Sequence, residues 1–165
     1  MLHKVSIAGL TMDPASNTPI IILKSEKNDQ AIPIWIGLLE ATSIASALQN
    51  IKYERPMTHD LFKKFTERLD ISISKIEVCD LKDNTFYAKI HFISKEGNFE
   101  MDARPSDAIA LALRYDAPIY VADEVMQKSK MADGEAEVLD TSEEGKKWAD
   151  YLEGLSPEDF GKFKI

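Results

Sequence analysis

The sequence is organised around one segment, Arg104-Pro105-Ser106-Asp107-Ala108-Ile109-Ala110-Leu111-Ala112-Leu113-Arg114-Tyr115. Pro105 disfavours a helical conformation for Arg104, and Ser106 is a residue type preferred at the N-cap of a helix. Asp107 places a negative charge in the first turn, where it interacts favourably with the helix dipole. Because only Ala, Ile and Leu follow for the next six residues, the segment predicts a helix that is buried on most sides. Capping does not explain an arginine immediately before this helix, so Arg104 is the first candidate functional residue.

The composition is that of a soluble protein that can build a core. The chain has 165 residues, of which 44% are hydrophobic and 29% charged, enough for one domain without disulfide staples. No apolar run approaches the ~20 residues of a membrane span, and the N-terminal residues lack the apolar stretch of a signal peptide. Cys79 is the single cysteine and cannot form an internal disulfide, so we expect a buried, inert thiol. These features predict a cytoplasmic protein with no membrane partner.

The negative charge is concentrated at the C-terminal end. Residues 131–165 hold ten acids and four bases, a net charge of −6 within a total of −8. The remainder is nearly neutral, and residues 52–68 hold five bases against three acids. This segment could form a basic surface for nucleic acid, and a solvated helix face is the alternative.

The order of predicted elements occurs twice. We expect strands at 4–10, 18–24 and 30–37 and a helix at 38–50, then a helix capped by Thr58, then strands at 71–81, 85–93 and 98–103 before the segment quoted above. Glu40-Ala41-x-x-Ile44-Ala45 also resembles Asp107-Ala108-x-x-Leu111-Ala112. The sequence therefore predicts a mixed α+β fold with an internal duplication of two β3-α units, about 3–50 and 71–115, whose central helices pack between two sheets.

The composition predicts a boundary near residue 130. Residues 1–130 would form the main domain, and residues 131–165 an acidic linker followed by a short helical tail. Trp148, Tyr151, Leu152 and Leu155 recur at helical spacing in that tail. Ser156-Pro157 then gives a second helix start.

Most catalytic motifs are missing from the sequence. The three histidines show no zinc-ligand spacing, and there is no phosphate-binding glycine loop, Gly-x-Ser-x-Gly elbow or Cys/His pair. A hairpin with its turn at Glu96-Gly97 would place His91 opposite Asp102, and Lys89 opposite Arg104. The sequence therefore predicts a polar surface beside the helix start.

Such a surface suits phosphodiester chemistry. Carboxylates can hold Mg²⁺ or Mn²⁺, an arginine can neutralise phosphoryl oxygens, and a histidine can transfer a proton near neutral pH. We expect Asp102, Asp107 and Glu40 as metal ligands, with Asp102 and Asp107 also in the catalytic set. Arg104 and Lys89 would bind the phosphate, and His91 would transfer the proton. A solvated outer face of the sheet is the alternative interpretation of these alternating charges.

Two motifs resemble a known family. Ile32-Pro33-Ile34-Trp35-Ile36-Gly37 followed by Glu40-Ala41, together with the segment from Arg104 to Ala112, resembles the bifunctional nuclease domain family over about residues 3–128. The ending at 155–163 is similar to the tail of bacterial members. The resemblance implies a mixed α/β fold with an internal duplication, a homo-oligomer (dimer or higher) and, for plant members, cleavage of DNA and RNA.

Two functions from different classes follow. The first is a nuclease that hydrolyses phosphodiester bonds in DNA and RNA with low sequence specificity and with the assistance of Mg²⁺ or Mn²⁺. The second is a non-enzymatic oligomeric module that binds or regulates a protein or a small anionic ligand. The acidic tail favours the second, because a segment of charge −6 repels nucleic acid.

Overall fold

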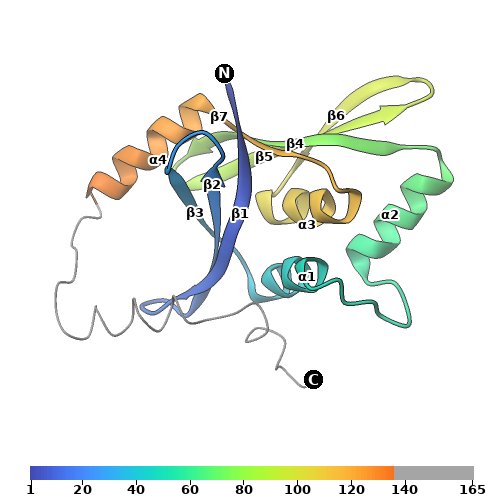
Figure 1. The fold of residues 1–165 in the computed structure, drawn as a ribbon, viewed down its shortest axis with the longest axis horizontal. Coiled ribbons are helices and arrows are strands. Elements are labelled where there is room, and N and C mark those ends of the chain that lie inside the picture. Colours follow the sequence, from blue (N-terminus) through green and yellow to red (C-terminus); the bar gives the residue numbers. More distant parts are fainter. Residues whose placement is uncertain (136–165) are drawn as a thin grey trace.

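The computed structural model describes residues 1–135, which form a mixed α+β domain (Figure 1). The elements in chain order are β1 (Leu2–Asp13), β2 (Thr18–Ser25), β3 (Ala31–Trp35), α1 (Leu38–Leu48), α2 (Thr58–Arg68), β4 (Ser72–Lys82), β5 (Thr85–Ser94), β6 (Gly97–Ala103), α3 (Pro105–Tyr115), β7 (Ile119–Ala122) and α4 (Asp123–Glu135). The predicted class and the twice-occurring order of three strands and a helix are confirmed. No helix in this part of the chain is both long and apolar enough to cross a bilayer.

The strands form one seven-stranded sheet in the order β3-β2-β1-β7-β4-β5-β6. The two sheets that we expected are therefore two halves of a single sheet. β7 joins the halves, because it pairs antiparallel with β1 and parallel with β4. The two halves lie at a steep angle to each other, and α1 and α3 lie within that angle (Figure 1).

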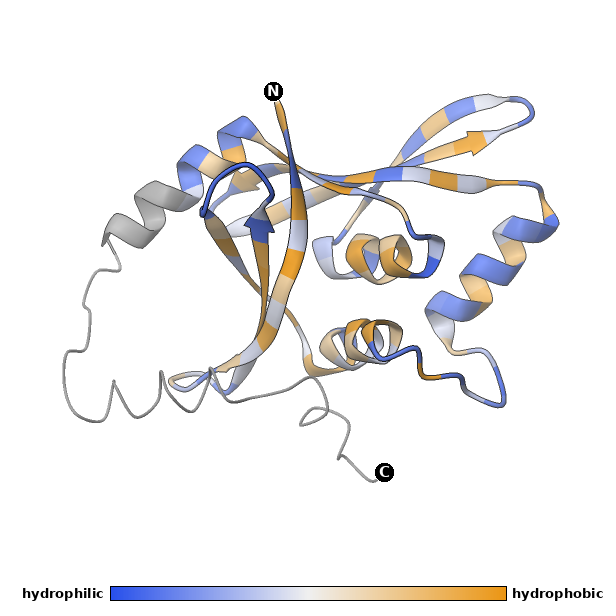
Figure 2. Cartoon of the chain, in the orientation of Figure 1, coloured by the Kyte–Doolittle hydropathy of each residue, from blue (hydrophilic) through white to orange (hydrophobic). Residues whose placement is uncertain are grey.

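Small residues let α1 and α3 pack on each other at the centre of the domain. Ala41 and Ala45 on α1, and Ala108 and Ala112 on α3, are each at most 5% exposed. α1 contacts β2, α3 contacts β4 and β5, and the two helices contact each other. The body of α3 is almost entirely hydrophobic, whereas α2 alternates between polar and apolar residues (Figure 2). The helix pair is thus the core around which the sheet is folded.

Two helix starts differ from the prediction, by two residues in α3 and by one residue in α2. α3 begins at Pro105 with Arg104 as its N-cap, and no side chain caps it. Ser106 is the second helical residue and is buried, so its prediction as N-cap was wrong. A proline at the first helical position fits, because its missing N–H would have no intrahelical partner. α2 likewise begins at Thr58 with Met57 as its N-cap.

The register of the β5–β6 hairpin differs by two residues from the prediction. The loop consists of Lys95-Glu96, with Ser94 opposite Gly97. Gly97 has φ +133°, a conformation that side chains rarely adopt, which fixes the glycine at the end of the turn. His91 therefore lies opposite Glu100 and not Asp102, and Lys89 lies opposite Asp102 and not Arg104.

The apolar residues of α2 do not share one buried face. Phe62 packs toward the core, with its ring centroid 6.3 Å from that of Phe92. Leu61, Phe65 and Leu69 are each more than half exposed. Exposed apolar side chains at helical spacing are typical of contact surfaces, and assembly into a homo-oligomer stays a prediction.

The C-terminal predictions lie mostly outside the described residues. α4 gives the described chain a short C-terminal helix and continues to Glu135, past the boundary that we placed at residue 130. The acidic stretch beyond it, the aromatic segment around Trp148 and the helix start at Ser156 all fall beyond residue 135.

Enlarging a buried alanine of α3 tests the close packing of α1 on α3. We expect Ala108→Leu to lower the free energy of unfolding by about 1–3 kcal/mol, because Ala108 is fully buried and added methylenes must displace neighbours. Urea denaturation measures this. The matched control is Ala31→Leu at an exposed position of β3, which should change stability by less than about 0.5 kcal/mol. Equal effects from the two changes would contradict the close packing.

Candidate functional site

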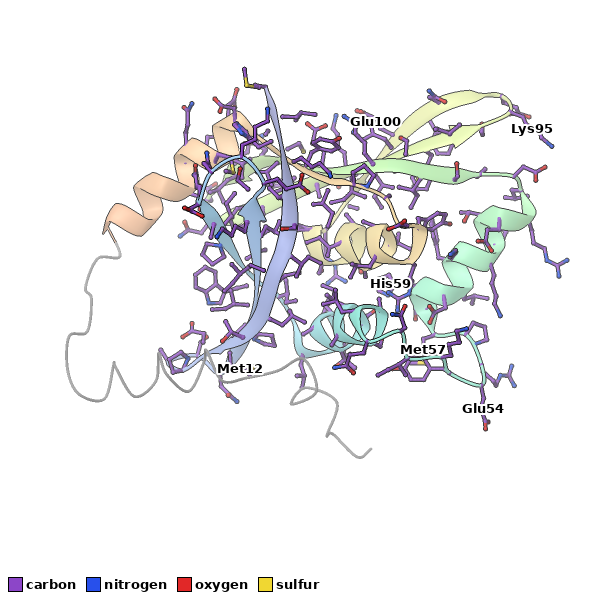
Figure 3. All side chains as sticks on the ribbon, viewed as in Figure 1. Met12, Glu54, Met57, His59, Lys95 and Glu100 are labelled. Atoms are coloured by element: carbon purple, nitrogen blue, oxygen red, sulfur yellow. The ribbon has the colours of Figure 1, made fainter. Side chains whose placement is uncertain are left out.

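Polar side chains from three helices meet at the starts of α1 and α3. We call this group the inner cluster, and it consists of Glu40, Ser43, His59, Arg104 and Asp107. The guanidinium of Arg104 links both helices, since its Nε lies 2.8 Å from Asp107 Oδ2 and its Nη1 2.8 Å from Glu40 Oε1. His59, in the first turn of α2, lies close to α1 and α3 (Figure 3). The structure thus brings together three residues predicted for the site: Glu40, Arg104 and Asp107.

Glu40 and Asp107 occupy equivalent positions in their helices. Each is the third residue of a helix, where a carboxylate interacts favourably with the free backbone amides and the helix dipole. The N-caps differ, because Gly37 precedes α1 whereas Arg104 precedes α3. A Cβ on Gly37 would lie 2.1 Å from Glu40 Oε2, so the glycine leaves space for this carboxylate. One arginine, Arg104, therefore donates hydrogen bonds to both carboxylates.

His59 connects Asp107 to a serine, and the sequence did not predict this. Its Nε2 lies 3.0 Å from Asp107 Oδ1, and its Nδ1 lies 2.8 Å from Ser43 Oγ. The imidazole is 17% exposed, so it is held between the helices while one edge stays accessible. No local signal could have found this chain of contacts, because Ser43, His59 and Asp107 are distant in sequence and only tertiary packing brings them together.

Two ionisable groups of the inner cluster have shifted pKa values. Partial burial raises the pKa of Asp107, but hydrogen bonds from Arg104 and His59 and the charge of Arg104 outweigh burial and hold the pKa below the usual 3.8. Hydrogen bonds to Asp107 and Glu40 raise the pKa of Arg104 above its usual value. The Arg104–Asp107 pair is therefore ionised at neutral pH.

Arg104 remains available to an incoming anion. Its side chain is 64% exposed, and its contacts with Glu40 and Asp107 use Nε and Nη1, so that within residues 1–135 the two N–H groups of Nη2 have no partner. A guanidinium carries five N–H donors in a planar fork that matches phosphate geometry. The two carboxylates orient this fork without using all of it.

A second arginine, Arg114, holds the three helices together. Its side chain is 8% exposed, and its Nε lies 2.7 Å from Asp60 Oδ1 on α2. Nη1 donates to the carbonyl of Ala110 on α3, and Nη2 donates to the carbonyl of Ser43 on α1. Asp60 adjoins His59 in sequence, so Arg114 fixes the helix turn that carries His59 and the backbone that carries Ser43.

The other predicted site residues lie on the opposite face of the sheet. Ala88, Ile90 and Phe92 of β5 are buried on the face that contacts α3, so Lys89 and His91, which alternate with them, project from the other face. Asp102 pairs in register with Lys89 and is exposed. We call this set the outer face, and it consists of Lys75, Glu77, Lys89, His91, Glu100 and Asp102. Glu100 lies on the side of β4 and β5 remote from α3 (Figure 3).

The charges of the outer face are mostly paired with each other. Lys89 forms an ion pair with Glu100, and Lys75 Nζ lies 3.3 Å from Glu77 Oε2. His91 Nε2 lies 3.4 Å from the same Glu77 oxygen, without hydrogen-bond geometry. A depression of about 360 Å³ lies beside His91 and Glu100. The outer face is thus a ladder of cross-strand pairs next to a shallow hollow.

The predicted metal ligands do not converge. Glu40 and Asp107 are bridged by Arg104, and Asp102 lies on the other face of the sheet. Within residues 1–135, no three His, Cys, Asp or Glu side chains are placed to hold one metal ion. The described residues therefore do not fit the Mg²⁺ or Mn²⁺ site that we expected.

Comparison with known proteins gives one family and two kinds of relative. The model of the bifunctional nuclease domain matches residues 21–133. An uncharacterized protein of Mycobacterium tuberculosis is 35% identical over 164 residues, which cover 96% of this chain and 98% of the relative. Bifunctional nuclease 1 of Arabidopsis thaliana is 29% identical over 124 residues, 73% of this chain and 38% of the plant protein. Bifunctional nuclease 1 of Oryza sativa subsp. japonica is 28% identical over 113 residues, which cover 66% of this chain and 34% of the rice protein.

The ionised state of Asp107 predicts a pH dependence of stability. Because the pKa of Asp107 is lowered by folding, its contribution is present above the unfolded value near 3.8 and is lost as the pH falls through the lower folded value. We expect Asp107→Asn to cost about 1.5–3 kcal/mol at neutral pH, and the cost should decrease as the pH falls below 3.8. Urea denaturation between about pH 2 and 7 measures this difference. A cost that is independent of pH would contradict the assignment, and Asp102→Asn on the outer face is the control.

Removing the guanidinium of Arg114 tests its role in holding α2. We expect Arg114→Met to lower the free energy of unfolding by about 3 kcal/mol, because Asp60 and the carbonyl of Ser43 lose their partner. Arg68→Met, at an exposed position of α2, is the matched control and should cost less than about 0.5 kcal/mol. Thermal and urea unfolding report the two effects, and a small effect from Arg114→Met would show that α2 is held in another way.

Proposed function

Because the chain belongs to the bifunctional nuclease domain family, we propose that it hydrolyses phosphodiester bonds in DNA or RNA at the inner cluster. The resemblance drawn from the sequence is thereby confirmed. The family and the plant relatives support a nuclease-type function, and this chain spans 34% and 38% of the length of the two plant proteins. The single observation that carries the choice of site is the bonded chain from Arg104 through Asp107 to His59.

The inner cluster can supply the two functions that phosphodiester hydrolysis requires. The free N–H groups of Arg104 can neutralise charge on the non-bridging phosphoryl oxygens. His59 can take a proton from the attacking oxygen and pass it to the leaving oxygen, and Asp107 stabilises the imidazolium formed between these steps. The starts of α1 and α3 also direct backbone amides toward an anion here.

The loop before α2 supports a nucleic-acid substrate. Lys52 and Arg55 are exposed in this loop, and Tyr53 is 43% exposed between them. Basic side chains that alternate with an aromatic ring can bind a phosphate backbone and stack on a base. The loop leads directly into the turn that carries His59, so a strand bound along it would reach the inner cluster.

A binding module without catalysis is the second candidate. The exposed stripe of Leu61, Phe65 and Leu69 on α2 favours it, because such apolar surfaces mark contacts with other proteins. The absence of cleavage by the folded wild-type protein would favour this function over the first.

Paired substitutions decide between the inner cluster and the outer face. We expect His59→Gln, Asp107→Asn and Arg104→Met each to reduce cleavage roughly 10²–10⁴-fold, because each removes a proton-transfer or charge-stabilising group. The matched changes His91→Gln, Asp102→Asn and Lys89→Met on the outer face should leave the rate within about twofold. The assay follows plasmid nicking and cleavage of single-stranded RNA, in Mg²⁺, in Mn²⁺ and in chelator.

The outcomes of this assay test the location of the active site and the nuclease activity separately. Loss of cleavage in the outer-face variants alone would move the active site to the hollow beside His91. Unfolding curves for all six variants show whether a loss of cleavage comes from a loss of folded structure. No cleavage by the wild-type protein under any of the metal conditions would contradict the proposed activity.

A further inference from the structure

A serine hydroxyl is bonded to the side of His59 opposite Asp107. Asp107 is ionised and can only accept hydrogen bonds, so Nε2 of His59 carries a proton toward Asp107 Oδ1 at 3.0 Å. This tautomer is assigned from the hydrogen-bond network. In the neutral imidazole Nδ1 is then an acceptor, and the Ser43 hydroxyl donates to it at 2.8 Å. The order is serine, histidine, aspartate, with one proton on each bond.

We propose that Ser43 is the nucleophile of the phosphodiester hydrolysis proposed above and that it forms a covalent phosphoseryl intermediate. The bonded order is that of a Ser-His-Asp triad with the two imidazole nitrogens exchanged. A serine hydroxyl is a weak nucleophile until an adjacent base accepts its proton, and Nδ1 of His59 is placed to do so. This inference rests on the proposed function for its substrate, but the nucleophile can be tested without nucleic acid.

The position of Ser43 on α1 supports this role. Ser43 follows Glu40 by three residues, so both project from one side of the helix. Glu40 binds Arg104, which places the guanidinium on the same side as the hydroxyl. The backbone of Ser43 is also fixed, because its carbonyl accepts from the guanidinium of Arg114 and from the hydroxyl of Ser46. Nucleophile, base and phosphate-binding group therefore come from rigid elements.

The reaction balances with water as the only co-reactant. In the first step a bond forms between Ser43 Oγ and phosphorus, and the ester bond to the leaving nucleotide oxygen breaks. The serine proton passes to Nδ1 of His59 and from there to the leaving oxygen. In the second step water attacks phosphorus and gives a proton to Nδ1, which returns it to Ser43 Oγ as the serine leaves. One phosphodiester and one water give a phosphomonoester and an alcohol.

Two measurements on the full chain test this proposal. The first uses a fluorophosphonate probe, a phosphorus electrophile that reacts with activated serines, and locates the adduct by peptide mass spectrometry. We expect labelling of Ser43 that falls at least about tenfold in His59→Gln, since the base is lost. The second quenches a single turnover of end-labelled oligonucleotide with acid and looks for labelled protein. Ser43→Ala should abolish both adducts and reduce cleavage at least about 100-fold.

The control is Thr42→Ala, which removes a hydroxyl from the adjacent residue of α1. Thr42 is exposed and its hydroxyl donates to the carbonyl of Leu38, so labelling and cleavage should stay within about twofold of wild type. Cleavage by Ser43→Ala at more than about a tenth of the wild-type rate, or turnover with no protein adduct, would overturn the proposal and leave water as the nucleophile. Labelling of Ser43 without cleavage of any nucleic acid would support the nucleophile and contradict the nuclease function. Absence of both labelling and cleavage would contradict both.

Discussion

The buried guanidinium of Arg114 is the interaction on which the site depends. It bonds to α3 through Ala110, to α1 through Ser43 and to α2 through Asp60. α2 needs this anchor, because Thr66 is its one fully buried residue and Phe62 its main apolar contact with the core. Burying a charge is costly unless it is fully paired, and here the pairing spans all three helices. The Arg114 side chain therefore helps to fix the relative positions of Ser43 and His59.

The order of three strands and a helix occurs twice in the domain, and the candidate site lies where the starts of the two helices differ. Glu40 and Asp107 are equivalent acids in the first turns of the two central helices. Their caps differ, and the glycine of the first helix leaves space that Glu40 occupies while the arginine of the second reaches across to it. Two arginines at this point would repel each other, and two glycines would leave both acids unpaired. The two helix starts thus contribute to a single cluster.

Sequence patterns were sufficient for the elements and insufficient for the contacts between them. Hydrophobic periodicity predicted the strands and the buried α3, because each depends on neighbours in sequence. The hairpin register was wrong by two residues, since such a shift keeps every side chain on its face and leaves the alternation unchanged. Ser43 and His59 were missed because they are 16 residues apart and meet only when α2 packs on α1 and α3. The residues expected at helix starts included Arg104, Asp107 and Glu40. The hydrogen bonds from Arg104 to both carboxylates could not be predicted from the sequence.

The ion-pair partners of the basic side chains explain why we propose the inner cluster, and not the outer face, as the site for a phosphate. On the outer face Lys89 is paired with Glu100 and Lys75 with Glu77, so each lysine has its own carboxylate and an anion would have to displace it. In the inner cluster two carboxylates bind Nε and Nη1 of one arginine, whose side chain is 64% exposed, and Nη2 has no partner among the described residues. The acids therefore orient the positive charge without covering it. The geometry by which we propose that Arg104 binds an anion is set by the same residues that we first took for metal ligands.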